Sequence, residues 1–246
     1  MNPQPDAESL AALYSDPESN EFSSDDYKPF ENERDSIEGV LGELKRLRPT
    51  GHLMEVGCGR GNFLKMARDA GYTVEGCDYF GGIRPAIEGV PLHDGSLHDS
   101  KLPDASCDIL VMRLTLEHVI SPRDELAEIH RVLKPGGIFY VKVPNVRYEQ
   151  GAGCRLLYGQ STAFGAPHHL NHFSSKTLDR MLESSGFTVR KPYLERPATR
   201  RSWKQNLPRQ VFHLFARVLQ ISTYGILFPE VVISGTVRKR TAAAHT

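Results

Sequence analysis

The chain has 246 residues, 39% of them hydrophobic, and its 30 basic and 30 acidic side chains give a formal net charge of zero. This length is enough to bury one sizeable core, and the zero net charge offers no general attraction to nucleic acid, so no nucleic-acid partner is expected. The polar, acidic N-terminus does not resemble a signal peptide, and no apolar run approaches the ~20 residues that span a bilayer, which predicts a cytoplasmic protein.

Charge is distributed unevenly along the chain. Residues 1–35 contain ten Asp or Glu against two Lys or Arg, whereas residues 190–240 contain eleven Lys or Arg against two Asp or Glu. Residues 1–33 include few large apolar side chains, so they are predicted to form a flexible acidic arm. The aromatic residues of the arm would either pin it to the body or help it to close over a ligand. The remainder, 34–246, is predicted to fold as one domain.

The four cysteines lack the spacing of a disulfide or zinc framework. Cys58, Cys77, Cys107 and Cys154 include no C-x-x-C pair, and three of them fall in or beside predicted strands or the glycine-rich loop described below. We expect them to be reduced and to behave as small apolar residues, as in a cytosolic protein.

Strands and helices alternate along the chain. The predicted elements are a helix over 34–47, a strand ending at Val56, a helix from Asn62 to near Gly71, strands at 73–77 and 90–93, a fourth strand within 104–119, a helix from 121 to about 134, a strand at 138–145, a helix after Ser174, and strands at 187–190 and 231–237. This alternation requires a parallel sheet with helices on both faces. The predicted fold is α/β, a Rossmann-like seven-stranded sheet that is mostly parallel with an antiparallel last strand.

A glycine-rich turn follows the first strand. Gly57, Gly59 and Gly61 alternate with other residues just before a predicted helix, so backbone N–H groups at the helix start would face a ligand close to the turn. A dinucleotide fingerprint has the spacing G-x-G-x-x-G, whereas here the third fingerprint position is Asn62. Glu55 is well placed for a ligand ammonium and poorly placed for a pyrophosphate. These features argue against a dehydrogenase.

Two further segments carry a family resemblance. The glycine-rich turn and the segment Arg131-Val132-Leu133-Lys134-Pro135-Gly136-Gly137 together resemble the class I S-adenosylmethionine (SAM)-dependent methyltransferases. The segment Pro167-His168-His169-Leu170-Asn171-His172-Phe173-Ser174 resembles a signature of the branch that acts on small molecules and glycans, which includes the ubiquinone-biosynthesis-like methyltransferases. The resemblance implies a SAM-dependent methyltransferase domain over 34–246, in which insertions at 146–172 and 196–228 would cap the substrate.

The resemblance also implies SAM as the cofactor, S-adenosylhomocysteine as the product, and a set of residues that hold them. Glu55 and the glycines would bind the methionine part. Asp78 closes the second strand 21 residues after Gly57, where a carboxylate can accept hydrogen bonds from both ribose hydroxyls. The loop from Asp94 would border adenine. The implied cofactor-binding residues are Glu55, Gly57, Cys58, Gly59, Gly61, Asp78, Tyr79, Asp94, Gly95, Ser96, Leu97, Arg113 and Leu114.

Histidines mark the predicted acceptor side. His169 and His172 match positions of the family signature, and His118 follows Glu117 at the exit of the fourth strand. An H-H-x-x-H run suggests a metal, but it lacks an accompanying carboxylate or cysteine cluster in sequence, and transfer from a sulfonium needs no metal, so no metal site is expected. His118 and His169 are therefore the candidate catalytic bases. The alternative is that these imidazoles orient the loop or stabilise the strand exit.

The predicted reaction is direct in-line displacement, in which a hydroxyl of a small molecule or sugar attacks the methyl group of SAM. The exit of the fourth strand lacks the Asn/Asp-Pro-Pro-Tyr motif of enzymes that methylate amino groups. Carbon, protein and RNA acceptors remain alternatives, as does a SAM-binding interaction module without catalysis.

A basic amphipathic stretch within 196–220 completes the inventory of candidate contacts. Val211, Leu214, Phe215 and Val218 form an apolar stripe that basic residues precede. The stretch would pack on the sheet edge or at a dimer contact, or it would meet a membrane surface or an anionic substrate. A monomer or a homodimer is compatible with either arrangement.

Overall fold

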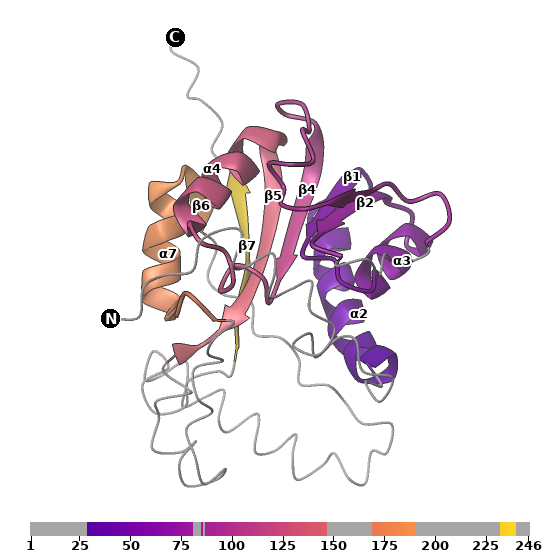
Figure 1. Ribbon diagram of the computed structural model, residues 1–246, viewed down its shortest axis with the longest axis horizontal. Helices are drawn as coiled ribbons and strands as arrows, with labels where there is room; N and C mark the ends of the chain where they lie inside the picture. Colours follow the sequence, from indigo (N-terminus) through magenta and orange to yellow (C-terminus); the bar gives the residue numbers. More distant parts are fainter. Residues whose placement is uncertain (1–28, 81–84, 86, 147–168, 190–231, 240–246) are drawn as a thin grey trace, which may run out of the picture.

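A computed structural model describes residues 29–80, 85, 87–146, 169–189 and 232–239, and Figure 1 shows their arrangement. The predicted arm up to residue 28, most of the first insertion and all of the second insertion lie outside the described residues. None of the helices in the described part is long and apolar enough to cross a membrane.

One sheet organises the structure. Its strands are β1 (His52–Val56), β2 (Thr73–Asp78), β3 (Leu92–Asp94), β4 (Cys107–Arg113), β5 (Leu133–Pro144), β6 (Phe187–Val189) and β7 (Val232–Lys239). They lie in the order β3-β2-β1-β4-β5-β7-β6. The pairs among β1 to β5 are parallel, and β7 is antiparallel to both β5 and β6. The predicted α/β, Rossmann-like and mostly parallel sheet is confirmed.

Helices cover both faces of the sheet (Figure 1). The helices are α2 (Pro29–Leu47), α3 (Asn62–Asp69), α4 (Pro122–Val132) and α7 (Ser175–Ser184). One core cluster joins the apolar side chains of α2 and α3 to one face, and a second joins those of α4 and α7 to the other. Strands buried on both faces explain why β1 and β4 read as almost continuous apolar runs.

Most element boundaries agree with the prediction to within about two residues, and two starts differ more. Helix α2 begins at Pro29, before the predicted start at Arg34, because proline suits the first helical position and acidic residues suit the first turn. Strand β5 begins at Leu133, before the predicted start at Ile138. The reason is a long-range pairing, since Leu133 already lies opposite Cys107 and the ladder resumes at Ile138 after a register shift.

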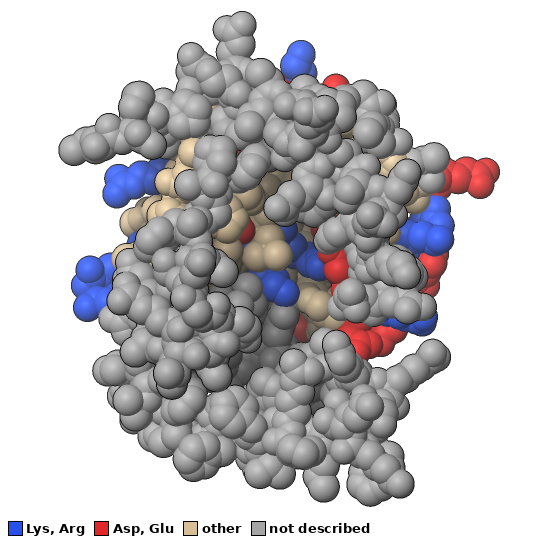
Figure 2. Space-filling model, turned by 60° about the horizontal axis from the view of Figure 1, so that its bottom comes forward, with Lys and Arg blue, Asp and Glu red and all other residues tan. Residues whose placement is uncertain are grey.

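The parallel strands end at one edge of the sheet, which is turned toward the viewer in Figure 2. Here Lys or Arg side chains and Asp or Glu side chains of the described residues come to the surface close together. Ligands of open α/β sheets bind outside the carboxyl ends of the strands. The three described cysteines, Cys58, Cys77 and Cys107, are buried and free, as predicted.

Candidate functional site

The glycine-rich turn lies between the end of β1 and the start of α3. All three glycines have positive φ angles, 73° at Gly57, 49° at Gly59 and 73° at Gly61. A Cβ atom would lie 2.2 Å from Thr115 Oγ1 at Gly57 and 2.1 Å from Ile87 Cδ1 at Gly61. At Gly59 such an atom would meet nothing within 4 Å. The outer glycines therefore lie against neighbouring side chains of the protein, whereas Gly59 faces open space.

The side chain of Asp78 joins the end of β2 to this turn. Its Oδ2 accepts a hydrogen bond of 2.6 Å from Gly59 N, and its Oδ1 accepts one of 2.7 Å from Tyr79 N. Burial raises the pKa of Asp78, while the two backbone donors oppose that shift. A carboxylate has about four lone-pair sites, so Asp78 retains acceptor capacity for a ligand.

Two large apolar side chains are exposed beside the turn. Tyr79 follows β2 and Leu114 follows β4, and each is 44% exposed. Leu114 has a φ angle of 53°, a left-handed backbone that is unusual for a bulky residue, and its N–H donates to Lys142 O. Backbone strain of this kind is concentrated at ligand sites. The two side chains offer a flat apolar ring or base a place to pack.

A buried pair of a carboxyl group and a guanidinium lies at the end of β1. Glu55 is 2% exposed, and its Oε1 lies 3.9 Å from Arg113 Nη1. Burial raises the pKa of Glu55 to about 8, although the guanidinium of Arg113 opposes the shift. Among the described residues, neither Glu55 Oε2 nor Arg113 Nε has a hydrogen-bond partner. A carboxyl group and a guanidinium with free hydrogen-bonding capacity lie side by side, which matches a zwitterionic ligand group whose ammonium would favour ionisation of Glu55.

The predicted adenine loop follows β3. Asp94 Oδ1 accepts a hydrogen bond from Phe80 N, and Gly95 N donates to Asp78 O, so the loop is tied to the end of β2. Ser96 donates to Asp99 Oδ2 through both its N–H and its hydroxyl. The Leu97 side chain is fully buried in the core, so only the backbone of Leu97 could contact a ligand.

Cys58 also offers only its backbone. The side chain of Cys58 is 6% exposed, and a Cβ atom at Gly76 of β2 would lie 3.1 Å from its Sγ. Burial raises the pKa of the Cys58 thiol. The thiol is therefore neutral and packed against the sheet.

The structure brings the two candidate bases together. The rings of His118 and His169 lie edge to face with their centroids 4.9 Å apart. Backbone hydrogen bonds of 2.9 Å from Leu170 N and Asn171 N to Glu117 O hold the second segment against the exit of β4. The pair forms because the chain returns at residues 169–171 to the exit of β4.

Sequence reasoning did not single out Glu117, which lies beside this pair. Its side chain is 1% exposed, and its Oε1 lies 4.0 Å from His118 Nε2. Glu117, His118 and His169 also place one donor atom each within 4.8 Å of one another. The signal in the sequence was the acidic residue directly before His118. It was interpreted only as part of the exit of the fourth strand.

Glu125 on α4 is a second carboxyl that the sequence did not single out. Burial raises its pKa to about 7, with smaller contributions from Glu128 and Asp99. Because Asp99 belongs to the loop after β3, this contribution shows that the Glu125 carboxyl lies near that loop. The only sequence signal for Glu125 is its place on α4, directly before Leu126 of the buried apolar face.

Comparison with known proteins identifies the family. A family model described as a methyltransferase domain matches residues 31–191. The chain belongs to the methyltransferase domain family. The matched range holds the glycine-rich turn, Asp78, Arg113 and both candidate bases, so every described part of the site lies within the methyltransferase domain.

Similar proteins agree with this assignment. A probable S-adenosylmethionine-dependent methyltransferase of Mycolicibacterium smegmatis is 32% identical over 143 residues, which cover 56% of this chain and 52% of that protein. A malonyl-[acyl-carrier protein] O-methyltransferase of Serratia marcescens is 33% identical over 112 residues, 43% of each chain. The chain therefore spans about half the length of the curated relatives that it matches.

A solved structure shares the fold. The 1,6-didemethyltoxoflavin-N1-methyltransferase of Burkholderia thailandensis, with bound 1,6-didemethyltoxoflavin and S-adenosylhomocysteine, aligns with a TM-score of 0.64 at 16% identity. The alignment covers 98% of this chain and 93% of that chain. At this identity the likeness concerns the architecture of the methyltransferase domain and not its acceptor.

Proposed function

We propose that this methyltransferase-domain protein binds SAM and transfers its methyl group to a hydroxyl of a small molecule or sugar. The relatives named as SAM-dependent methyltransferases support the cofactor. The acceptor is argued from the site, because the named relatives differ in theirs.

The observation that carries the proposal is the buried pair of Glu55 and Arg113. The methionine part of SAM bears an ammonium and a carboxylate, which are complementary to one side chain each. Glu55 Oε2 and Arg113 Nε retain hydrogen-bonding capacity that described residues do not use. Leaving such buried groups without partners costs about 1–3 kcal/mol each, so a ligand that satisfies both is strongly favoured.

The adenosine part fits the adjoining features. Asp78 has lone pairs available to ribose hydroxyls while it holds Gly59 N and Tyr79 N. The exposed Tyr79 and Leu114 would flank the adenine ring, whose faces need apolar contact. The open space at Gly59 would admit the ligand close to the backbone.

Methyl transfer then depends on the His118 and His169 pair. When bound, SAM supplies a methyl group on a positive sulfur, which the acceptor oxygen takes by in-line displacement, leaving S-adenosylhomocysteine. One imidazole of the pair would receive the hydroxyl proton, and the second ring would fix its orientation. Glu117, with Oε1 at 4.0 Å from His118 Nε2, would stabilise the imidazolium that forms. Holding acceptor and methyl group in line contributes the larger share, up to about 7–11 kcal/mol of the barrier.

Calorimetric titration of the full chain tests the cofactor, with S-adenosylhomocysteine compared against NADH. We expect micromolar binding of S-adenosylhomocysteine and no binding of NADH. The acceptor is tested with SAM that carries an isotopic label on its methyl group, offered to matched pairs of hydroxylated compounds and their deoxy analogues. Labelling of the hydroxylated member alone supports the proposal, whereas labelling of both members or of neither contradicts it.

A further inference from the structure

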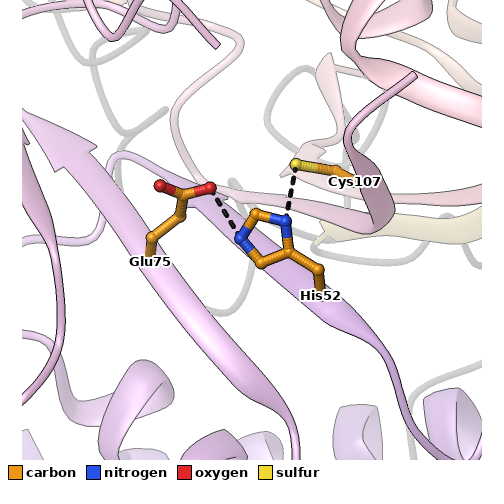
Figure 3. Close-up of side chains that lie close together, drawn as sticks. All are labelled: His52, Glu75 and Cys107. Atoms are coloured by element: carbon orange, nitrogen blue, oxygen red, sulfur yellow. Dashed lines mark hydrogen bonds and ion pairs between the residues drawn. The ribbon is translucent and has the colours of Figure 1, made fainter. Parts of the chain in front are cut away.

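A second cluster of polar side chains lies at the other end of the sheet (Figure 3). His52 Nε2 lies 2.6 Å from Glu75 Oε1, and His52 Nδ1 lies 3.6 Å from Cys107 Sγ. Cys107 is fully buried, the Glu75 side chain is 9% exposed, and that of His52 is 27% exposed. Cys107 and Glu75 are thus shielded from solvent, and the cluster reaches the surface through the imidazole of His52.

Three neighbouring strands contribute these residues. His52 opens β1, Cys107 opens β4, and Glu75 lies in β2 opposite Met54. Alternate residues of a strand share a face, so His52 and Glu75 lie on the same face of the sheet. The glycine-rich turn follows Val56, four residues beyond His52, which places the cluster about 13 Å from the proposed cofactor site at about 3.3 Å a residue.

We propose that His52, Glu75 and Cys107 form a zinc site that joins the three central strands. One nitrogen, one oxygen and one sulfur donor lie within 4.8 Å of one another, and none of these residues serves the proposed methyl transfer. Thiolate and imidazole together favour Zn²⁺ among the common divalent ions. With three protein ligands, the fourth tetrahedral position would be taken by water on the exposed side of His52.

A half-turn of the His52 ring would complete the geometry. In Figure 3 the two nitrogens of His52 face Glu75 and Cys107, and the Cε1 corner lies between them. A half-turn of the ring about its Cβ–Cγ bond exchanges Cε1 and Nε2, which brings a nitrogen between the carboxylate and the thiol. Zinc bond lengths imply donor separations of roughly 3.2–3.8 Å, so donors that now lie within 4.8 Å of one another would need to close by up to about 1.6 Å.

A supporting residue already orients the carboxylate. His93 of β3 lies with its Nε2 3.0 Å from Glu75 Oε2, the oxygen that His52 does not contact. Metal-binding carboxylates are commonly held in this way by outer hydrogen bonds. The arrangement therefore provides three ligands and an outer partner from four adjacent strands.

The alternative to a zinc ion at this cluster is a proton on His52. The contacts with Cys107 and Glu75 raise the pKa of His52 to about 10 in the metal-free protein, so an imidazolium would fill the same position. A nucleophilic Cys–His–Glu arrangement is excluded by access, because Cys107 is 0% exposed. Metal binding therefore distinguishes the two occupants, proton or zinc.

Cobalt titration of the full chain, without a polyhistidine tag and after treatment with a chelator, tests the proposal. Co²⁺ bound to a thiolate gives a sulfur-to-metal charge-transfer band in the near ultraviolet. We expect this band to saturate at one equivalent in the wild type and to disappear when one equivalent of Zn²⁺ is added. Cys107→Ala and His52→Gln should lose the band, and His93→Gln should weaken binding by about 10-fold or more.

Matched controls give the test its specificity. Cys77→Ala removes the other fully buried cysteine of the same sheet face and should retain the band. Metal bound at Glu117, His118 and His169 would give no such band, because that group contains no sulfur. Circular dichroism checks that each variant folds. If Cys107→Ala does not fold, His52→Gln provides the test instead. Absence of the band in the wild type, or its persistence in folded Cys107→Ala or His52→Gln, overturns the zinc site.

Discussion

The ring of His118 stands edge to face with the ring of His169, although one follows β4 and the other lies beyond the insertion that follows β5. The backbone bonds from Leu170 and Asn171 to Glu117 O fix this proximity. Two imidazoles and a buried carboxylate are thereby held at the end of the strand that also carries Arg113.

Replacing either histidine tests the proposed base. We expect His118→Ala or His169→Ala to lower kcat by about 10²–10⁴-fold if that residue takes the proton, while S-adenosylhomocysteine affinity changes little. His98→Ala is the control, because the His98 side chain is 85% exposed and lies 3.9 Å from Glu128. Full turnover in both site variants at saturating SAM would show that the proton goes elsewhere.

Asp78→Ala should weaken binding of S-adenosylhomocysteine at least 10-fold. The variant loses the proposed charge-assisted bonds to ribose, each of the order of 1.5–3 kcal/mol, and it frees the two N–H groups that Asp78 now holds. Titration calorimetry measures the affinity, and Asp69→Ala, at the exposed end of α3, provides the matched control. An unchanged affinity in the folded Asp78 variant would disprove the ribose role.

The buried Glu55 predicts an unusual pH dependence of stability. Its pKa is about 8 in the folded protein and 4.5 when unperturbed, as in the unfolded chain, so between these pH values the Glu55 carboxyl is ionised in the unfolded chain and protonated in the folded protein. This group therefore lowers stability progressively as pH rises from about 4.5 to about 8, by about 1.4 kcal/mol for each unit of pKa difference.

Thermal unfolding of the ligand-free protein checks that sign. Glu55→Gln removes the cost, so its Tm should match the wild type near pH 4.5 and exceed it near pH 8. The same variant should bind S-adenosylhomocysteine more weakly, because the ligand ammonium loses its countercharge. A Tm advantage that shrinks with rising pH contradicts the assignment.

Alanine substitutions at Gly57 and Gly59 should distinguish an effect on stability from an effect on ligand binding. Gly57→Ala places a Cβ atom 2.2 Å from Thr115 Oγ1, so it should destabilise the protein by well over the ~1–2 kcal/mol of left-handed backbone strain alone. Gly59→Ala incurs only the backbone strain, but its methyl group enters open space at the proposed ligand position. We expect Gly59→Ala to lose at least 10-fold in S-adenosylhomocysteine affinity with a smaller change in Tm. Wild-type affinity in Gly59→Ala would show that the ligand lies elsewhere.

The sequence was informative wherever a pattern is local. The alternation of strands and helices predicted the sheet, because apolar period and turn residues act within a few positions. Glu55 and Asp78 could be selected because each stands at a fixed place relative to a strand end. Both do lie at the edge of the sheet to which the glycine-rich turn belongs.

Pairing between distant segments was beyond local reasoning. The sequence supplied His118 and His169 as separate candidates, and their contact depends on the return of the chain to β4. The early start of β5 depends on the pairing of Leu133 with Cys107. The donors of the proposed zinc site are likewise far apart in sequence, and they meet because parallel register aligns three strands.

The hydrogen bond from Gly59 N to Asp78 Oδ2 also bears on how fast a ligand can be captured. In the ligand-free protein the turn is already held by β2, because the Asp78 side chain accepts a hydrogen bond from Gly59 N. Little backbone entropy is then lost at this end of the site on association. The turn acts as a preorganised half of the site, so association with this half should proceed without a slow conformational step.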